Sequence, residues 1–220
     1  MTYSLNFGEN SYTIVAFINL QLKRLGQMIE SFKAPIEKQI FKSEDYSKKS
    51  FEYHTFINCS FNNCNFSESL LRNAKFCSCT FTGCNFSLVK LDGSRMQDVQ
   101  FIDCKIVGAE FFKCERAFFS TCFKNCLLHY CNFSDLNMKN TAFTESKLKE
   151  NYFTNASLNG ADFSETDLSG TIFHNCDLSK ADFSSAKCYD IDPRTNKIKK
   201  AKFSLPEVVG LLRGLDIIIV

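Results

Sequence analysis

Cysteine is the residue type in this sequence with the greatest capacity for chemistry. The chain has 12 cysteines among 220 residues, and the stretch FINCSFNNCNFS holds two of them, Cys59 and Cys64, five positions apart. Thiolates bind zinc when four ligands converge on one ion, usually from closely spaced Cys pairs with partner cysteines or histidines. The pair therefore has two interpretations, half of a metal site or a structural role.

No other residues in the sequence form the set that catalysis or metal binding needs. His54, His129 and His174 are scattered, and no nucleophile and base accompany them. The sequence also has no Cys-x2-Cys pair with partner histidines, no glycine-rich phosphate loop and no motif of paired catalytic carboxylates. We therefore expect no metal site, no cofactor and no enzymatic activity.

The charge and hydropathy of the chain argue against further classes. The formal net charge is +2, which points to neither nucleic acid nor a membrane as a partner. No apolar run reaches about 18 residues, so we expect no membrane-spanning segment. The first basic residue is Lys23, and no A-x-A-like site follows SYTIVAFINLQL, which argues against a secretory signal. We expect a cytoplasmic location, where disulfides would be unusual.

Large apolar residues recur every five positions and define the elements that must hold the cysteines. Stepping by five from Phe41 to Phe111 meets fifteen large apolar residues in a row. The register then slips by two and resumes from Phe118 to Phe183 with fourteen more. A period of five fits neither the 3.6 of a helix nor the 2 of a strand. It fits a chain that turns a corner every five residues and points one large side chain inward each time.

A second inward position precedes each large residue by two. From Cys59 to Ala109 and from Thr121 to Ala181, 22 of these 24 positions are Cys, Ala, Ser, Thr or Val, and the exceptions are Leu136 and Asn151. Free cysteine behaves there as a small buried hydrophobe, and a spacing of five puts neighbours on adjacent walls rather than around one ion. The cysteines at this position are Cys59, Cys64, Cys79, Cys84, Cys104, Cys126, Cys131 and Cys176. The structural interpretation is therefore favoured over a metal site.

The tandem pattern small-x-(Leu/Phe)-x-x, seen in CNFSE, AKFCS, GCNFS, ADFSE and CDLSK, resembles that of pentapeptide repeat proteins. The resemblance covers about 150 residues. It implies an all-β fold, a right-handed quadrilateral β-helix (pentapeptide-repeat solenoid) with four pentapeptides per coil. Because the repeat is a scaffold, this resemblance says little about function.

The C-terminal sequence narrows the resemblance. YDIDPRTNKIKKAKFSLPEVVGLLRGLDIIIV, from Tyr189 to Val220, is similar to the closing segment of Qnr-type quinolone-resistance proteins. That resemblance implies a dimeric DNA mimic that binds type II topoisomerases, DNA gyrase and topoisomerase IV, and protects them from fluoroquinolones. It implies no direct binding to nucleic acid. The alternative is a pentapeptide-repeat scaffold for protein–protein interaction with a different partner.

The chain divides into three segments by these patterns. Residues 1–38 do not fit the repeat, and we interpret them as a helical cap or as the result of a misassigned start, with Met28 as the true first residue. Residues 39–190 are predicted to form the β-helix, with a frame break at 112–117. Residues 191–220 are predicted to form a turn, a short helix that caps the tube, and an apolar tail for dimerisation.

An acidic wall is the surface expected to face a topoisomerase. Residues 20 apart stack on one wall of such a tube, so one wall collects acidic residues from segments 141–145, 161–165 and 181–185, which contain no Lys or Arg. A basic DNA-binding surface would attract this wall, and an ordinary solvated face is the alternative interpretation. The predicted wall consists of Glu145, Asp162, Glu165 and Asp182, and the other acidic candidates are Asp167, Asp177, Asp190 and Asp192.

Two further surfaces carry predicted contacts. The frame break is too short for more than a bulge or stubby loop, whereas many Qnr proteins have longer loops; its residues are Phe112, Lys113, Cys114, Glu115, Arg116 and Ala117. Ser204 and Glu207 have the spacing of a capping box at the start of the C-terminal helix. That helix and its tail are too apolar for a free surface, which predicts a two-fold dimer contact, with a monomeric cap as the alternative. The predicted contact residues are Leu205, Val208, Val209, Leu211, Leu212, Leu215, Ile217, Ile218 and Ile219.

Overall fold

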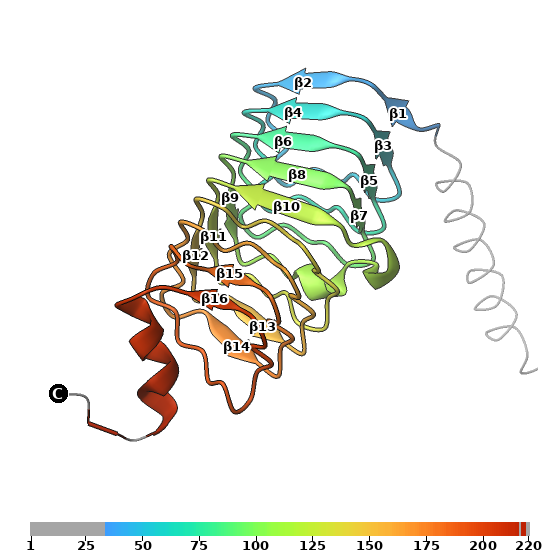
Figure 1. Cartoon of the computed structure of the whole chain (residues 1–220). Helices are drawn as coiled ribbons and strands as arrows, with labels where there is room; N and C mark the ends of the chain where they lie inside the picture. The colour runs from blue at the N-terminus through green and yellow to red at the C-terminus, as the bar shows by residue number, and fades with distance from the viewer. Residues whose placement is uncertain (1–33, 216, 219–220) are drawn as a thin grey trace, which may run out of the picture. The chain divides into compact units, whose positions relative to one another are not determined.

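The computed structural model shows a tube built from short parallel strands (Figure 1). The structure describes residues 34–215 and 217–218. The helical cap or alternative start that the sequence suggests before residue 34 lies outside the described residues, as does Ile219 of the predicted dimer contact. Within the described part of the chain, no helix has the length and apolar character needed to cross a membrane.

The tube is a right-handed, four-sided β-helix, as the sequence predicts. Successive coils pair in parallel with a register of 20 residues, so that Phe56 lies beside Phe76 and Phe61 beside Phe81. We name the four sides walls A to D in the order in which the chain follows them. Because each strand is only two to four residues long, most of the backbone pairing joins coils rather than neighbours in sequence.

The strands and short helices have the following bounds. Wall A carries β1 (Ile36–Glu37), β3 (Thr55–Ile57), β5 (Lys75–Cys77) and β7 (Arg95–Gln97). Wall B carries β2 (Ile40–Lys42), β4 (Ser60–Asn62), β6 (Thr80–Thr82), β8 (Val99–Ile102) and β10 (Thr121–Lys124), followed further along the tube by β15 (Asp182–Phe183) and β16 (Lys202–Phe203). Wall C carries β9 (Lys105–Val107), β11 (Leu127–His129) and β12 (Lys147–Lys149), and wall D carries β13 (Tyr152–Thr154) and β14 (Ile172–His174). Three 3-10 helices complete the list: η1 (Phe111–Lys113), η2 (Arg116–Phe118) and η3 (Glu207–Leu215).

One large side chain from each wall fills the bore in every coil, as the period of five predicts. Phe143 and Phe163 stack on wall B with ring centroids 5.0 Å apart, and Phe143 meets Phe153 of wall D edge to face at 5.7 Å. On wall B such stacking runs without a break from Phe41 to Phe203. Aromatic pairs favour stacked and edge-to-face contacts, so the rings close the bore as well as filling it.

The small inward residues are also hydrogen-bond donors. Cys84 Sγ donates to the carbonyl oxygen of Phe61 at 3.3 Å, and Thr171 Oγ1 donates to that of Leu148 at 2.6 Å. In both cases the acceptor lies 23 residues earlier, on the preceding coil. These two buried groups are therefore satisfied by the coil before them, whereas the hydroxyls of Ser69 and Thr166 donate to a carbonyl three residues earlier in their own coil. The eight repeat cysteines are all buried, as expected of small core residues.

Asn151, one of the two larger residues at the small inward positions, also donates a hydrogen bond to the preceding coil. It is 0% exposed. Its amide nitrogen donates to the carbonyl of Leu128 at 3.0 Å, and its amide oxygen accepts from the backbone N–H of Cys131 at 2.7 Å. The other exception, Leu136, is buried as an ordinary core residue.

Each corner of the tube requires a left-handed backbone conformation. Every fifth residue along most of the tube has a φ between 50° and 71°, for example Asn63 with 54° and Gly83 with 64°. Asparagine and glycine adopt this conformation at the lowest cost. At Gly83 space is also short, because a Cβ atom there would lie 2.2 Å from Oδ1 of Asn63 on the previous coil.

The frame break lies later in the chain than the sequence predicts. Cys114 and Glu115, inside the predicted 112–117 segment, keep the normal 20-residue register. The Glu115 N–H donates to the carbonyl of Ser94 at 2.8 Å, and Cys114 Sγ lies 3.3 Å from Ser94 Oγ. The extra residues are those of η2, and beyond them Thr121 pairs with Val99, 22 positions earlier.

Phe118 lies outside the bore, which corrects the prediction that it is the first inward residue after the break. Its ring is 43% exposed and lies under the guanidinium of Arg95 at 3.8 Å, while Arg95 also bonds to Glu115 at 2.8 Å. Phe119 is buried instead and meets Phe111 edge to face at 6.0 Å. The cation–π contact stabilises the ring of Phe118 outside the bore. The neighbouring Phe119 is buried in its place.

The register shifts by two residues at one place in the last full coil and returns to 20 where Asp177 pairs with Lys197. Asp190 pairs with Ile172, 18 positions earlier, rather than 20. As a result Tyr189, not Cys188, enters the bore and packs against Phe183 with ring centroids 5.8 Å apart. The phenol of Tyr189 makes no hydrogen bond within the described residues, although it is buried.

The 3-10 helix η3 follows the last coil. Leu211 packs against the core, so part of η3 covers the end of the bore. The Ser204 hydroxyl donates to the carbonyl of Ser184 on the preceding coil. This contact differs from the capping box expected of Ser204 and Glu207, because Ser204 ties two coils together.

Replacing Asn151 by alanine should destabilise the tube by about 2 to 3 kcal/mol, because the buried N–H of Cys131 and carbonyl of Leu128 lose their partner. Asn159→Ala, at a partly exposed position on the outer surface, is the matched control and should cost no more than about 0.5 kcal/mol. Urea denaturation of both variants measures the difference. Equal costs would contradict a structural role for the buried amide.

Candidate functional site

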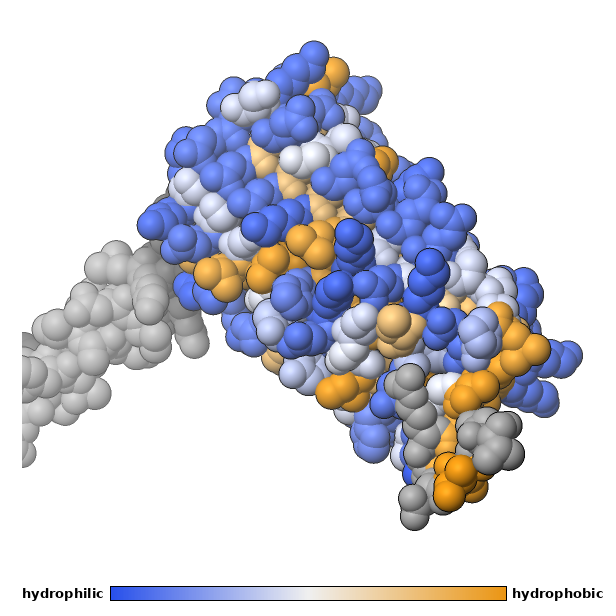
Figure 2. Space-filling model, turned by 90° about the vertical axis from the view of Figure 1, so that its left-hand side faces the viewer, coloured by the Kyte–Doolittle hydropathy of each residue, from blue (hydrophilic) through white to orange (hydrophobic). Residues whose placement is uncertain are grey.

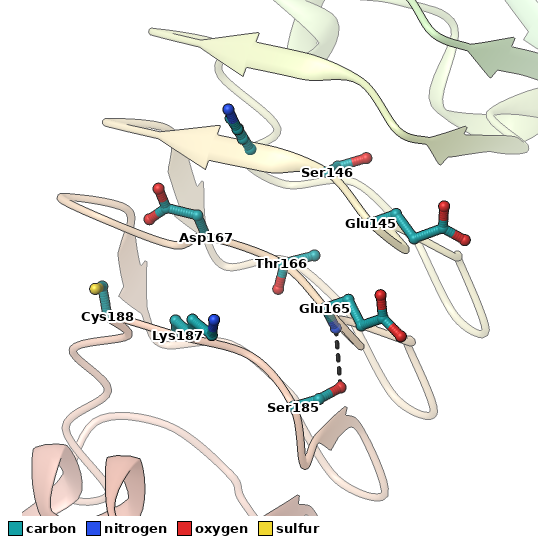
Figure 3. A pocket seen from close by; sticks show the side chains of 9 residues that line it. Glu145, Ser146, Glu165, Thr166, Asp167, Ser185, Lys187 and Cys188 are labelled. Carbon is teal, nitrogen blue, oxygen red and sulfur yellow. Dashed lines mark hydrogen bonds between the residues drawn. The ribbon is translucent and has the colours of Figure 1, made fainter.

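The four acidic residues of the predicted wall lie in two groups. Asp162 and Asp182 are on the outer surface of wall B, and their backbones pair in a parallel β-bridge between successive coils. Glu145 and Glu165 lie at the corner between walls B and C, with φ of 58° and 57°. Figure 3 shows both glutamates projecting to the same side of the tube, one coil apart. The structure therefore brings the four carboxylates to one edge of the molecule.

The aspartates also cap the backbone of their own pentapeptide. Asp162 Oδ1 accepts from the N–H of Ser164 at 2.8 Å, and Asp182 Oδ1 accepts from that of Ser184 at 3.0 Å. Asparagine does the same elsewhere, since Asn65 Oδ1 accepts from the N–H of Ser67 at 3.1 Å. Aspartate at this position thus has a structural reason to be present that is independent of its charge.

Two lysines that the sequence analysis did not include partly neutralise the wall. Lys202 Nζ of β16 lies 2.7 Å from Asp182 Oδ2, and Lys124 Nζ of β10 lies 3.4 Å from Glu145 Oε1. Both belong to coils that flank the 141–185 window, on the same wall. Register arithmetic extended by one coil in each direction would have found them. Asp162 and Glu165 have no salt bridge within the described residues.

The ion pair with Lys202 changes the acidity of Asp182. The ammonium of Lys202, with the hydroxyl and N–H of Ser184, lowers the pKa of this carboxyl from 3.8 to about 2. The carboxylate is therefore ionised at all ordinary pH values. Its charge is largely directed at Lys202 and is less available to a partner.

The other acidic candidates lie on different walls and do not join the strip. Asp167 is on wall C, 3.3 Å from Lys149, and Asp192 is in the following turn, 2.8 Å from Arg194. The backbone of Asp177 pairs with that of Lys197 on wall A. The backbone of Asp190 pairs with that of Ile172 on wall D. Acid density along the sequence therefore overstates the acid density of any one face.

A surface hollow of about 630 Å³ lies beside the corner glutamates. Figure 3 shows Glu145 and Glu165 on one side and Asp167 and Lys187 on the other, and Lys147 also lines the hollow. The lining combines both signs of charge, so it does not favour a ligand of a single charge. Ser185 Oγ accepts from the N–H of Glu165 at 2.9 Å and fixes the lower rim.

The cysteines are not set up for nucleophilic or metal chemistry. Burial raises the pKa of Cys131 and of Cys114 to about 12, so these thiols stay protonated at neutral pH. In residues 34–215 and 217–218, no group of three or more His, Cys, Asp or Glu side chains converges as a metal site would require. The three histidines lie on walls A, C and D.

The C-terminal end exposes a group of apolar side chains. Leu205 is 81% and Ile218 is 91% exposed. Four more large apolar residues of the predicted dimer contact are exposed: Val209, Leu212, Leu215 and Ile217. Val208 and Leu211 are partly buried. Figure 2 shows the orange residues at this end of the molecule.

Comparison with known proteins identifies the repeat. Residues 54–117 and 113–183 match the family model described as pentapeptide repeat region. No curated protein matches the chain.

Several solved structures are similar in architecture. Full-length QnrB1, described as a plasmid-mediated fluoroquinolone resistance protein, is 22% identical over 84% of this chain and 100% of its own, with a TM-score of 0.41. A trypsin-treated form of QnrB1 is 22% identical over 85% of this chain and 92% of its own, with a TM-score of 0.48. HetL, a pentapeptide repeat protein involved in heterocyst differentiation regulation in the cyanobacterium Nostoc, is 18% identical over 77% of this chain and 87% of its own, with a TM-score of 0.39.

Removing the charge of Lys202 should raise the pKa of Asp182 from about 2 toward its ordinary 3.8. The folded-state pKa lies below the unfolded value, so the pair stabilises the fold above about pH 4 and its contribution disappears as the pH falls toward 2. Because the pair is near the surface, the effect on stability should stay below about 1 kcal/mol.

Carbon-detected NMR titration of the Asp182 carboxyl in Lys202→Met measures the shift. Lys199→Met is the control, since Lys199 has no salt bridge among the described residues. An unchanged titration midpoint in Lys202→Met would contradict the ion pair.

Proposed function

This chain belongs to the pentapeptide repeat family, and on that basis we propose that it is a non-enzymatic protein-binding rod whose partner is a type II topoisomerase. In this proposal the rod occupies the DNA-binding surface of DNA gyrase or topoisomerase IV and protects the enzyme from fluoroquinolones. Two observations support it. One is the edge formed by Glu145, Asp162, Glu165 and Asp182, and the other is the Qnr-like sequence from Tyr189 to Val220.

The repeat of the carboxylates is the observation that carries the proposal. Two pairs, Glu145 with Glu165 and Asp162 with Asp182, recur at one-coil intervals along a straight stack of strands. Coils of a β-helix lie about 4.8 Å apart, so the negative charges recur at a regular spacing, and the two aspartates are held by their caps to Ser164 and Ser184. A basic surface evolved to bind phosphates would be attracted to such an edge.

The filled bore supports a function carried by the outer surface. Rings and branched aliphatic side chains occupy the interior of the described coils. A substrate therefore has no room inside the tube, and recognition falls to outward side chains. This is the arrangement expected of a scaffold for protein contacts.

A pentapeptide-repeat scaffold with a different partner is the second candidate. The pairing of Lys202 with Asp182 and of Lys124 with Glu145 favours it, because these contacts reduce the negative charge available to a basic surface. The last coil adds Lys197, Lys199 and Lys200, which resemble no part of duplex DNA.

A gyrase supercoiling assay with ciprofloxacin separates the two candidates. With the protein added, supercoiling should recover in the presence of the drug. Absence of recovery at every protein concentration, with gyrase and with topoisomerase IV, would reject the topoisomerase proposal and leave the second candidate.

A charge-neutralised variant tests the acidic edge itself. Glu145→Gln, Asp162→Asn, Glu165→Gln and Asp182→Asn together remove four charges while the new amide oxygens retain the caps to Ser164 and Ser184. This variant should need at least about tenfold more protein for the same recovery.

The matched control removes four charges from the other end of the tube. It combines Glu44→Gln, Asp45→Asn, Glu52→Gln and Glu68→Gln, and the amide oxygen introduced by Asp45→Asn would retain the cap to Ser47. The activity of this control should stay within about twofold of the unmodified protein. Equal losses in the two variants would show that the acidic edge is not the binding surface.

We also propose that the exposed apolar end of the tube mediates homodimerisation, since isolated chains seldom expose such a group of side chains. Light scattering after size-exclusion chromatography should give twice the mass of one chain. Leu212→Glu with Leu215→Glu should reduce it to one chain mass, while Ile40→Glu, 66% exposed near the N-terminal end of the tube, should leave the dimer intact. A monomer for the unmodified protein would overturn this contact.

A further inference from the structure

Exposed apolar side chains gather along one edge of the tube, away from its ends. The side walls of a solenoid are expected to be polar, yet Leu88, Leu127, Tyr130, Tyr152 and Ile172 are between 36% and 52% exposed. All five lie on wall C, on wall D, or at the corner between them. Outside this edge, the bulge residue Phe118 and the two ends of the tube account for the other large apolar residues that are exposed in the described chain.

The centre of this edge is a three-stranded sheet with an unusual outer surface. In β9, β11 and β12, Leu127 lies between Lys105 and Lys147, and His129 lies between Val107 and Lys149. The six outward side chains therefore form a grid of three lysines, one histidine and two aliphatic residues. Figure 2 looks onto this side of the tube and shows orange side chains among blue ones midway along it.

The corner beside the grid extends its apolar part. Tyr130 stacks on His129 with ring centroids 4.1 Å apart and planes 14° apart. Leu88 lies at the equivalent corner two coils earlier, and its side chain reaches over the corner between them, Gly108, where a Cβ atom would lie 3.2 Å from Leu88 Cδ2. Leu88 and Tyr130 therefore add apolar surface along the corner beside Leu127.

The charge of the grid is positive and only partly compensated. Lys149 lies 3.3 Å from Asp167, whereas Lys105 and Lys147 have no salt bridge within the described residues. Glu150 lies 3.9 Å from His129 at the corner, and its hydrogen bond raises the pKa of Tyr130. The two uncompensated ammonium groups flank Leu127, so an apolar contact there would be bordered by positive charge on both sides.

We propose that the basic-apolar face, defined as Lys105, Val107, Leu127, His129, Lys147, Lys149, Tyr130 and Leu88, binds an acidic protein segment with an apolar anchor residue. Its carboxylates would pair with Lys105 and Lys147, and its anchor would pack on Leu127 and Tyr130. Interfaces of this kind derive their affinity from a central apolar or aromatic contact and their specificity from the charges around it.

The chemistry of the face favours a protein over a nucleic acid. Single strands of nucleic acid bind to aromatic platforms on which bases stack. Here the centre of the face is Leu127, an aliphatic residue, and the exposed corner tyrosine is tied to Glu150, whose charge would repel a phosphate. This face is centred on wall C, whereas Asp162 and Asp182 of the acidic edge are on wall B. The two surfaces adjoin at the corner between these walls, where Lys147 shares a hollow with Glu145 and Glu165, and we infer a partner contact distinct from the topoisomerase contact.

Selection from a library of random twelve-residue peptides displayed on phage tests the proposal with the full chain as bait. The face variant Lys105→Gln, Leu127→Gln and Lys147→Gln serves for counterselection. The control variant Ile40→Gln, Lys42→Gln and Lys75→Gln removes one exposed apolar residue and two lysines elsewhere. Circular dichroism of both variants verifies that the β-fold is retained.

The peptides that depend on the face should be rich in Asp and Glu and contain one Leu, Ile, Phe or Tyr. By fluorescence anisotropy, the best of them should bind at least about tenfold more weakly to the face variant and within about twofold to the control variant. Its binding should weaken as salt is raised. Recovery of no face-dependent peptides, or of neutral or basic ones, would overturn the proposal.

Two further measurements exclude other occupants. A fluorescent twelve-residue oligouridylate should not bind; binding that the face variant loses would overturn the proposal in favour of nucleic acid. The face variant should also retain topoisomerase protection in the supercoiling assay. Loss of that protection would assign the face to the topoisomerase contact and overturn a separate partner, while failure of the unmodified protein to protect leaves the peptide result unaffected.

Discussion

The interior of the tube is the constraint on which the rest of this structure depends. Each wall contributes one large residue per coil, and a ring such as that of Phe163 must fit between Phe143 above and Phe183 below. This requirement sets the period of five, and the corners between walls set the left-handed backbone of residues such as Asn63. Because core residues occupy the inward positions, only outward side chains can contact a partner. The molecule is thus a set of four outer surfaces around a fixed interior.

The fold could be predicted from the sequence because that interior leaves a strict pattern, and the exceptions arise where a local contact competes with it. Spacing selects Phe118, whereas in the structure Phe119 is buried and Phe118 lies outside the bore against Arg95. The local register shift at Asp190, which accompanies the entry of Tyr189 instead of Cys188 into the bore, is likewise not visible in the spacing of large residues. The asparagines and glycines at the corners are a further sequence signal, because they are the residues that adopt the left-handed backbone conformation at the lowest cost.

The acidic edge was predictable in position but not in charge. The register of 20 residues correctly placed Asp162 beside Asp182. It also implied Lys202 and Lys124 in the flanking coils, which matter because a carboxylate within 2.7 Å of an ammonium presents little net charge to a partner. Side-chain caps could not be anticipated from charge counting either, since an aspartate that holds a serine N–H looks identical in sequence to one that faces a partner.

The cap made by Asp162 and its equivalents needs a side-chain oxygen but not a negative charge. The stability of the coil therefore does not depend on the charge that its surface carries. Asp and Asn codons differ by a single base, and both side chains supply the oxygen that accepts the serine N–H, as Asn65 does on wall C. Mutation can therefore redraw the electrostatic pattern of a wall, one coil at a time, with little penalty in folding. The same architecture can therefore present different patterns of surface charge, each suited to a partner of different charge.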